Sequence, residues 1–222
     1  MWDPVWDEIF RSQAWGKYPG EDLIRFVARH FYARPDRSAV RLLEIGCGPG
    51  ANLWFLAREG FGFTGVDGSE AAIRQAGERL DAECAGWRTR GSVMVHDIAA
   101  LPFKDATFDA VIDSQAVYAN PKTVAQRIFA EAARVTKPGG KLFSRAFAQG
   151  CWGEGTGTDL GDDAWICAEG PLKAKGLSRF MKEQDILEIH AGWTITSIEK
   201  IMRTMEEQRH EIHEWIIWAD KA

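Results

Sequence analysis

Residues 41–52 read RLLEIGCGPGAN and combine three structural signals in one short stretch. The apolar run 42–45 predicts a strand that is buried on both faces. Gly46, Gly48 and Gly50 follow at once, and glycine adopts positive φ and has no Cβ to keep a ligand away from the backbone. The residues after them predict a helix, whose first N–H groups lack partners inside the helix and can face a ligand. The stretch therefore predicts a strand, a glycine loop and a helix that together bind a nucleoside-containing small molecule.

Strand and helix signals alternate along the chain after this loop. Apolar runs predict strands at 61–66, 93–95, 108–112 and 141–147. Helical spacing predicts a helix at 51–58 and two more that begin after an N-cap residue. The N-caps are Ser69 and Asn120, and Pro121 is expected as the first helical residue after Asn120. A Lys-Pro-Gly-Gly turn at 137–140 precedes the last of these strands. Such alternation indicates an α/β fold with a mostly parallel sheet and helices on both faces. Ligands on these sheets bind outside the carboxyl ends of the strands, where Asp67, Asp97 and Asp113 are expected.

The length of 222 residues predicts a single domain, with two segments outside the alternating pattern. Residues 1–40 are expected to form an N-terminal helical lid, with an amphipathic helix at 21–31. Residues 41–147 are expected to form the cofactor-binding core, and residues 148–176 a substrate loop, whose glycine- and acid-rich part (150–176) is either functional or mobile. Residues 177–222 are expected to hold a helix at 179–190 and strands at 193–202 and 209–219.

Composition argues against several classes of protein. The net charge of −5 argues against nucleic acid as a stable partner, because that binding needs a basic face. No apolar run approaches the roughly 20 residues that cross a bilayer, and the acidic N-terminus lacks the basic region of a secretory signal. The cysteines have no metal-binding or disulfide spacing, and His210 and His213 would point to opposite faces of a strand. We therefore expect a cytoplasmic protein with reduced thiols, no metal and no membrane partner.

Five motifs, in order, resemble those of the class I S-adenosylmethionine-dependent methyltransferases, in particular the small-molecule enzymes of the type 11/12-like group. The motifs are Leu-Glu-Ile-Gly-Cys-Gly-Pro-Gly at 43–50, Gly-Val-Asp-Gly-Ser at 65–69, His-Asp-Ile at 96–98 with Leu-Pro-Phe at 101–103, Phe-Asp-Ala-Val-Ile at 108–112, and Arg-Val-Thr-Lys-Pro-Gly-Gly-Lys-Leu at 134–142. The resemblance covers roughly residues 40–147. It implies a Rossmann-like, doubly wound, seven-stranded sheet whose last strand is antiparallel.

The same resemblance implies S-adenosylmethionine as cofactor and S-adenosylhomocysteine as product. Asp67 would accept hydrogen bonds from the ribose hydroxyls, Asp97 would accept one from the adenine amino group, and Ile98 would pack on the ring. Glu44 would hold the loop or the ammonium side of the cofactor, and Ser114 would border the methyl-transfer centre. The implied cofactor site comprises Glu44, Gly46, Cys47, Gly48, Asp67, Gly68, Ser69, Asp97, Ile98 and Ser114.

The acceptor is expected to be a small molecule methylated on oxygen or nitrogen, by a monomer or a homodimer. Its pocket would include Trp15, Tyr18, Tyr118 and Trp152, from the N-terminal segment and from insertions after the fourth and fifth strands. Methyl transfer from a sulfonium needs orientation rather than a protein nucleophile. Asp113 and Tyr118 are possible bases and Arg145 a possible orienting cation, but no catalytic residue follows from the sequence.

Two other interpretations stay open. Gly46, Gly48 and Ala51 also satisfy G-x-G-x-x-A, the NADP-type variant of the dinucleotide fingerprint. A nicotinamide-dependent reductase would need a catalytic Tyr-x-x-x-Lys dyad, and we expect none. A catalytically silent S-adenosylmethionine-binding protein would be expected to have a damaged first motif, whereas this one is intact.

Overall fold

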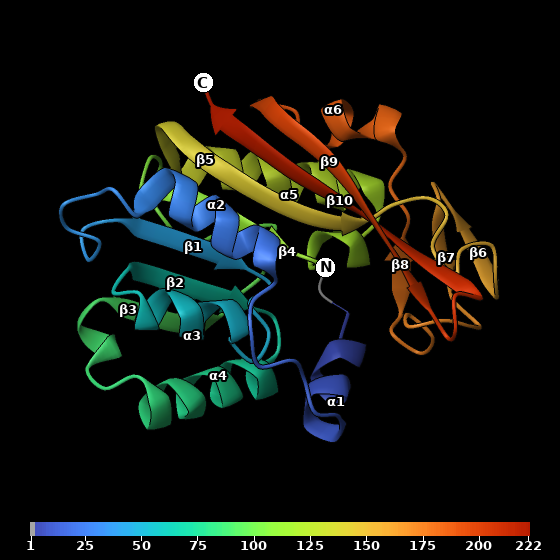
Figure 1. The fold of residues 1–222 in the computed structure, drawn as a ribbon, viewed down its shortest axis with the longest axis horizontal. Coiled ribbons are helices and arrows are strands. Elements are labelled where there is room, and N and C mark those ends of the chain that lie inside the picture. The colour runs from blue at the N-terminus through green and yellow to red at the C-terminus, as the bar shows by residue number, and fades with distance from the viewer. Residues whose placement is uncertain (1–2) are drawn as a thin grey trace.

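The computed structural model describes residues 3–222 and contains a seven-stranded mixed sheet (Figure 1). In spatial order its strands are β3 (Gly91–Val95), β2 (Gly62–Asp67), β1 (Arg41–Ile45), β4 (Phe108–Ser114), β5 (Thr136–Phe147), β10 (His210–Lys221) and β9 (Trp193–Met205). Strands β1 to β5 pair in parallel, and β10 lies antiparallel between β5 and β9. The prediction of a seven-stranded sheet with an antiparallel last strand is confirmed.

Helices cover both faces of the sheet because its central strands are apolar on both faces. In β1, Leu42 packs toward α2 (Glu21–Phe31) and α3 (Ala51–Arg58), whereas Leu43 and Ile45 pack toward α5 (Lys122–Val135) on the other face. The period of two that governs strand side chains produces this division. Helix α4 (Glu70–Glu83) follows β2, and the Ser69 hydroxyl caps it by accepting a hydrogen bond from the Ala72 N–H at 3.0 Å.

The segment 150–176, expected to be a functional or mobile loop, contains regular structure. It contributes to a small antiparallel sheet of β6 (Thr158–Gly161), β7 (Ala164–Ile166) and β8 (Leu177–Arg179), beside the end of the large sheet. Phe180, Cys167 and Leu172 pack there with Tyr118 and Phe147 of the core. This apolar cluster holds the segment against the domain.

The helix expected at 179–190 is wrong for most of its length. Arg179 ends β8, and only the short turn η3 (Glu183–Asp185) and helix α6 (Ile186–Ile189) follow. The Phe180 N–H donates to the Asp163 carbonyl at 2.9 Å and the Met181 N–H to the Phe147 carbonyl at 2.8 Å. These bonds to other segments keep the backbone extended where the apolar spacing alone favoured a helix.

Two smaller differences concern proline and glycine. Pro121 is the N-cap of α5 rather than its first helical residue, with an extended ψ of 151°. The Lys-Pro-Gly-Gly stretch forms a bulge within β5, where Gly139 has a φ of +71°. Phe108 of β4 therefore pairs with Thr136, whereas Ala110, two residues further on, pairs with Lys141.

Among residues 3–222, none of the helices is both long and apolar enough to cross a lipid bilayer.

Three short elements were not located by the sequence. Helix α1 (Val5–Ser12) precedes α2 and packs against α4, and the short turns η1 (Trp87–Thr89) and η2 (Val117–Ala119) follow α4 and β4. The Asp7 carboxylate accepts hydrogen bonds from the Ser69 hydroxyl at 2.6 Å and the Ala71 N–H at 3.0 Å, at the start of α4. The Gln75 side chain also donates to the Phe10 carbonyl at 2.6 Å. These bonds fix α1 over the carboxyl end of the sheet.

Candidate functional site

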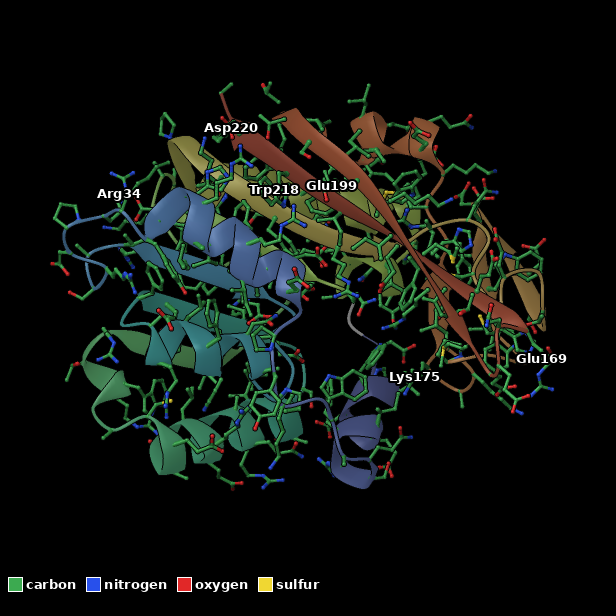
Figure 2. All side chains as sticks on the ribbon, in the orientation of Figure 1. Arg34, Glu169, Lys175, Glu199, Trp218 and Asp220 are labelled. Carbon is green, nitrogen blue, oxygen red and sulfur yellow. The ribbon has the colours of Figure 1, made fainter. Side chains whose placement is uncertain are left out.

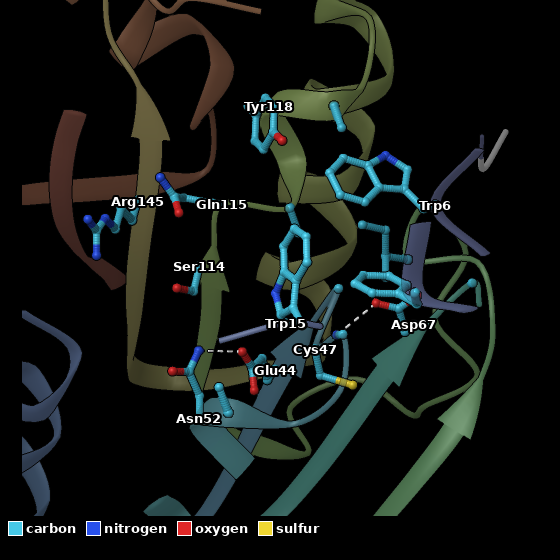
Figure 3. A pocket seen from close by; sticks show the side chains of 18 of the residues that line it. Trp6, Trp15, Glu44, Cys47, Asn52, Asp67, Ser114, Gln115, Tyr118 and Arg145 are labelled. Carbon is cyan, nitrogen blue, oxygen red and sulfur yellow. Dashed lines mark hydrogen bonds between the residues drawn. The ribbon is translucent and has the colours of Figure 1, made fainter. Parts of the chain in front are cut away.

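A cavity of about 380 Å³ lies at the carboxyl ends of β1, β2 and β4 (Figure 3), a size that suits a small ligand. One side is formed by the glycine loop and the strand ends, and the other by α1, residues 15–20 and the segment before β8. The lining includes Glu44, Gly46, Cys47, Gly48, Asn52, Asp67, Gly68, Asp97, Ile98, Ser114, Gln115, Tyr118 and Arg145 from the core, and Asp3, Trp6, Phe10, Trp15, Tyr18, Leu172 and Lys175 from the covering segments.

The glycine loop has the predicted backbone conformation, but its glycines also serve protein packing. Gly46, Gly48 and Gly50 have φ values of +66°, +51° and +81°. A Cβ on Gly46 would collide with the Cβ of Ala116 in the loop after β4. The N–H groups of Gly46 and Cys47 donate to the Val66 carbonyl at 2.7 and 3.1 Å. The loop is therefore held against β2 and the end of β4, with its edge facing the cavity.

Asp67 ends β2 at the cavity wall and is tied to the backbone on both sides. Its Oδ2 accepts a hydrogen bond from the Gly48 N–H at 2.8 Å, and its Oδ1 accepts one from the Ser69 N–H at 2.8 Å. Burial raises the pKa of this carboxyl, while the two backbone donors oppose that rise. Each oxygen keeps a second lone pair, so the group can also accept from a ligand.

Glu44, the penultimate residue of β1, is buried at the base of the cavity. Its Oε1 accepts a hydrogen bond from the Asn52 side chain at 2.6 Å, whereas its buried Oε2 has no partner within residues 3–222. Desolvation raises the pKa of Glu44 to about 8 despite the Asn52 hydrogen bond. An unpartnered carboxyl oxygen at a cavity wall favours a cationic ligand group, since such a group would replace the hydrogen bonds to water that burial removes.

The remaining residues of the predicted cofactor site divide into two sets. Asp97 and Ile98 line the cavity just after β3, and the Asp97 Oδ1 accepts from the Ala99 N–H at 2.9 Å. Ser114 lies at the end of β4 and also lines it. Ser69 does not line it, because its hydroxyl is fully buried between Asp7 and the first turn of α4. Ser69 therefore positions Asp67 and α4 rather than facing a ligand.

Three of the four predicted acceptor residues line the cavity, and Trp152 does not. Tyr118 is buried beside Trp6 with ring centres 6.5 Å apart, and Trp15 lies 6.0 Å from Trp6 (Figure 3). Trp152 instead stacks on His210 at 3.9 Å. The backbone of the segment hydrogen-bonds to β10, and this pairing draws Trp152 away from the cavity.

Of the two possible bases, only Tyr118 borders the cavity. Asp113 is buried and accepts bonds from the Ala116 and Val117 N–H groups and the Ser144 hydroxyl, at 2.8 to 3.1 Å. Burial raises the pKa of Asp113 to about 6 and moves the pKa of Tyr118 well above its usual range. Asp113 thus shapes the loop after β4, and Tyr118 stays protonated as a hydrogen-bond donor.

The expectation that the chain lacks a Tyr-x-x-x-Lys pair is wrong, because Tyr118 and Lys122 have this spacing. The structure places the two side chains in different surroundings, with Tyr118 at the cavity and Lys122 away from it. The Lys122 ammonium pairs with Asp185 at 3.0 Å and Glu188 at 2.8 Å, in the region of α6, and it does not line the cavity. The pair therefore does not form the dyad that a reductase would need.

Among the lining residues, Trp6 and Phe10 were not anticipated from the sequence, and neither was the contact that holds Gln115 and Arg145. Trp6 and Phe10 come from α1, whose i, i+4 apolar spacing after Pro4 is the signal that could have revealed it. Gln115 has a positive φ of +61° and, with Arg145, binds the buried carboxylate of Glu214 on β10. No local pattern predicts that contact, since 69 residues separate Arg145 from Glu214. Within residues 3–222 no group of three or more His, Cys, Asp or Glu side chains is placed to hold a metal.

Comparison with known proteins gives one family match. Residues 42–140 match the family model described as a methyltransferase domain. The malonyl-[acyl-carrier protein] O-methyltransferase of Erwinia pyrifoliae is 37% identical over 54% of this chain and 41% of its own length. A tRNA N(3)-methylcytidine methyltransferase of Schizosaccharomyces pombe is 25% identical over 94% of this chain and 91% of its own. The chain spans less than half the length of the first three curated relatives it matches.

A solved structure shows the same fold. The 1,6-didemethyltoxoflavin-N1-methyltransferase of Burkholderia thailandensis, with bound 1,6-didemethyltoxoflavin and S-adenosylhomocysteine, aligns with a TM-score of 0.64. The alignment covers 98% of this chain and 88% of that chain at 18% identity. At this identity the likeness concerns the arrangement of the elements alone.

Proposed function

We propose that this chain is a class I S-adenosylmethionine-dependent methyltransferase that transfers a methyl group to an oxygen or nitrogen atom of a small-molecule acceptor. The observation that carries the proposal is the placement of Glu44, Asp67 and Asp97 around one cavity, at the ends of three adjacent strands. Three carboxyl groups facing one cavity favour a ligand with cationic and hydroxyl groups over a pyrophosphate.

The residues present fit S-adenosylmethionine. The unpartnered Oε2 of Glu44 would hold the ammonium group, and the free lone pairs of Asp67 would accept from the ribose hydroxyls. Asp97 would accept from the adenine amino group, with Ile98 against the ring. When bound, the cofactor supplies a methyl carbon already activated by its sulfonium.

The chain's own part in the transfer is to orient the acceptor and exclude water. Trp6, Trp15 and Tyr118 form an apolar wall over the cavity. The Tyr118 hydroxyl would donate a hydrogen bond to the acceptor, because its raised pKa keeps it protonated. Gln115 and Arg145, both held by Glu214, would complete the polar contacts at this end. We assign no general base.

A small acceptor is favoured over nucleic acid. Helix α1 and the segment before β8 contribute side chains to one side of the cavity, which narrows the space open to an acceptor. The chain's net charge of −5 also opposes a polyanion. The similarity to a tRNA methyltransferase makes RNA the alternative acceptor to test.

Calorimetry followed by a transfer assay tests the proposal. The full chain is titrated with S-adenosylhomocysteine and, separately, with NADPH; we expect binding of the first alone. Methyl-labelled S-adenosylmethionine is then incubated with a small-molecule extract, with total RNA and with protein, and we expect label in the small-molecule fraction. NADPH binding without S-adenosylhomocysteine binding would support a reductase. Label in RNA would replace the acceptor class, and cofactor binding without any transfer would support a silent binding protein.

A further inference from the structure

Lys175 brings a cation to the cavity without a carboxylate to neutralise it. Its side chain lines the cavity, and its residue lies in the loop before β8, beside α1 (Figure 2). The ammonium lies 3.4 Å from Gln13 Oε1 and 5.2 Å from the centre of the Trp15 ring. Within residues 3–222 it forms no ion pair, and desolvation lowers its pKa. A partly buried ammonium with only these contacts is incompletely compensated.

The other charged groups at this end of the cavity already have partners. Arg145 forms a two-point contact with the buried Glu214, at 2.6 and 3.2 Å. Asp3 also lines this end; its Oδ1 accepts from the Val5 N–H at 3.0 Å, and its Oδ2 lies close to Gly176, the residue after Lys175. Among the described residues, Lys175 is therefore the cation at this end that no carboxylate pairs with directly, whereas the opposite end holds Glu44, Asp67 and Asp97.

The walls between these two ends are aromatic. Trp6 contacts both Trp15 and Tyr118 edge to face, and Tyr118 meets Phe147 with ring centres 4.8 Å apart. Edge-to-face rings leave flat apolar faces that accommodate a planar body. A ligand that satisfies both features is flat and apolar in its body and anionic at one end.

We propose that the methyl acceptor is an aromatic or similarly flat molecule with an oxyanion, a carboxylate or a phosphate, and that Lys175 binds this oxyanion. The inference rests on the proposed function, since it assigns this end of the cavity to the acceptor. Asp67 and Asp97 at the opposite end disfavour such an anion and so fix the direction in which the acceptor enters. Lys175 is thus a specificity-determining residue.

Matched probe molecules test the inference on the full chain. The probes are 2-naphthoate, 2-naphthyl phosphate and the neutral 2-naphthamide, whose binding is measured by ligand-observed NMR with and without saturating S-adenosylhomocysteine. We expect at least one anion to bind about tenfold more tightly than the amide, the effect of one charged hydrogen bond. The preferred anion distinguishes a carboxylate from a phosphate acceptor.

Variants at position 175 provide the decisive comparison. Lys175→Gln should reduce the anion preference to less than about twofold, and Lys175→Arg should retain it because the charge remains. Lys173→Gln, at an exposed lysine of the same loop, is the matched control and should behave like the wild type. Equal binding of amide and anions by the wild type, or an unchanged preference in Lys175→Gln, would overturn the inference. Failure of S-adenosylhomocysteine to bind would count against the proposed function alone, because the preference is also measured without it.

Discussion

At the proposed nucleoside end of the cavity, Asp67 and Asp97 accept hydrogen bonds from backbone amides, whereas at the proposed acceptor end aromatic side chains from separate segments meet around Arg145 and Lys175. The bonds of Asp67 and Asp97 are to N–H groups of adjacent loops and turns. Trp6, Tyr118 and Lys175 meet only because α1, the loop after β4 and the segment before β8 converge. The first end is organised by successive strand–loop units of the core, and the second by packing between segments far apart in the sequence. Substitutions at the two ends should therefore separate cofactor binding from acceptor binding.

The largest effect is expected from Asp67→Ala. This substitution removes two backbone hydrogen bonds and the proposed ribose contacts at once. Hydrogen bonds to a charged group contribute about 1.5–3 kcal/mol, so S-adenosylhomocysteine affinity should fall roughly 10- to 150-fold. Isothermal titration calorimetry measures the change. Asp67→Asn keeps one acceptor oxygen, so its S-adenosylhomocysteine affinity should lie between those of the wild type and Asp67→Ala. It replaces the alanine variant in the experiment if that variant does not fold.

Asp109→Ala is the matched control for this loss. Asp109 also accepts from a backbone N–H, that of Arg41 at 2.8 Å, and from Lys137, but it lies outside the cavity. The control should lower the free energy of unfolding without a change in cofactor affinity beyond about twofold. An equal loss of affinity in both variants would show that the effect at Asp67 comes from the fold alone.

The next effect is a proton linkage at Glu44. With a pKa of about 8 this carboxyl is mostly protonated at pH 7 in the unliganded chain. An ammonium at Oε2 would lower that pKa, so binding should release close to one proton and affinity should rise by up to about tenfold per pH unit from pH 6 to 8. Calorimetry in buffers of different ionisation enthalpy counts the proton. Glu44→Gln should release none, and an unchanged proton count in that variant would contradict the assignment.

The same carboxyl makes the unliganded fold sensitive to pH. Its folded pKa lies above the ordinary value of 4.5. The stability it contributes is therefore fully present below pH 4.5 and is lost as pH rises toward 8, at up to about 1.4 kcal/mol per pH unit. Urea unfolding at pH 5 and pH 8 should show a smaller difference for Glu44→Gln than for the wild type.

The fold of residues 41–147 could be predicted because its signals are local. Positive φ at Gly46, the N-cap at Ser69 and the apolar alternation of β1 each depend on residues a few positions apart. The parallel sheet follows from the repetition of such units. The carboxylates at the strand ends then meet at one edge, as parallel pairing requires.

The acceptor end could not be predicted in the same way. The position of Trp152 depends on a backbone hydrogen bond between its segment and β10, nearly 60 residues away. The Arg145–Glu214 contact joins the neighbouring strands β5 and β10, which are also far apart in the sequence. The expected helix at 179–190 failed for the same reason, since backbone bonds to Phe147 and Asp163 overrode its local spacing. Contacts of high sequence separation leave no periodic trace in one sequence.

A smaller effect is expected at the junction of the two ends, where Asp7 of α1 caps α4. Asp7→Ala should lower the free energy of unfolding by about 1–2 kcal/mol, the range measured for lost helix caps. Hydrogen exchange should become faster in α1 first, while the amides of β2 stay protected. Glu8→Ala, at an exposed position on the same helix, is the control and should change neither quantity. Equal loss of protection in β2 would mean that α1 and the core unfold as one unit.

The smallest effect is expected from Cys47→Ala, although Cys47 lies in the glycine loop itself. Its Sγ points toward Gly65 and the apolar cluster beneath the sheet rather than into the cavity (Figure 3). The loop therefore presents its backbone to a ligand at this position. Loss of a buried sulfur should lower the free energy of unfolding by about 1 kcal/mol, while S-adenosylhomocysteine affinity should change less than about twofold, because no ligand contact is removed. Titration calorimetry and urea unfolding of the same sample test both expectations. A tenfold loss of affinity at unchanged stability would show that the thiol itself contacts the cofactor.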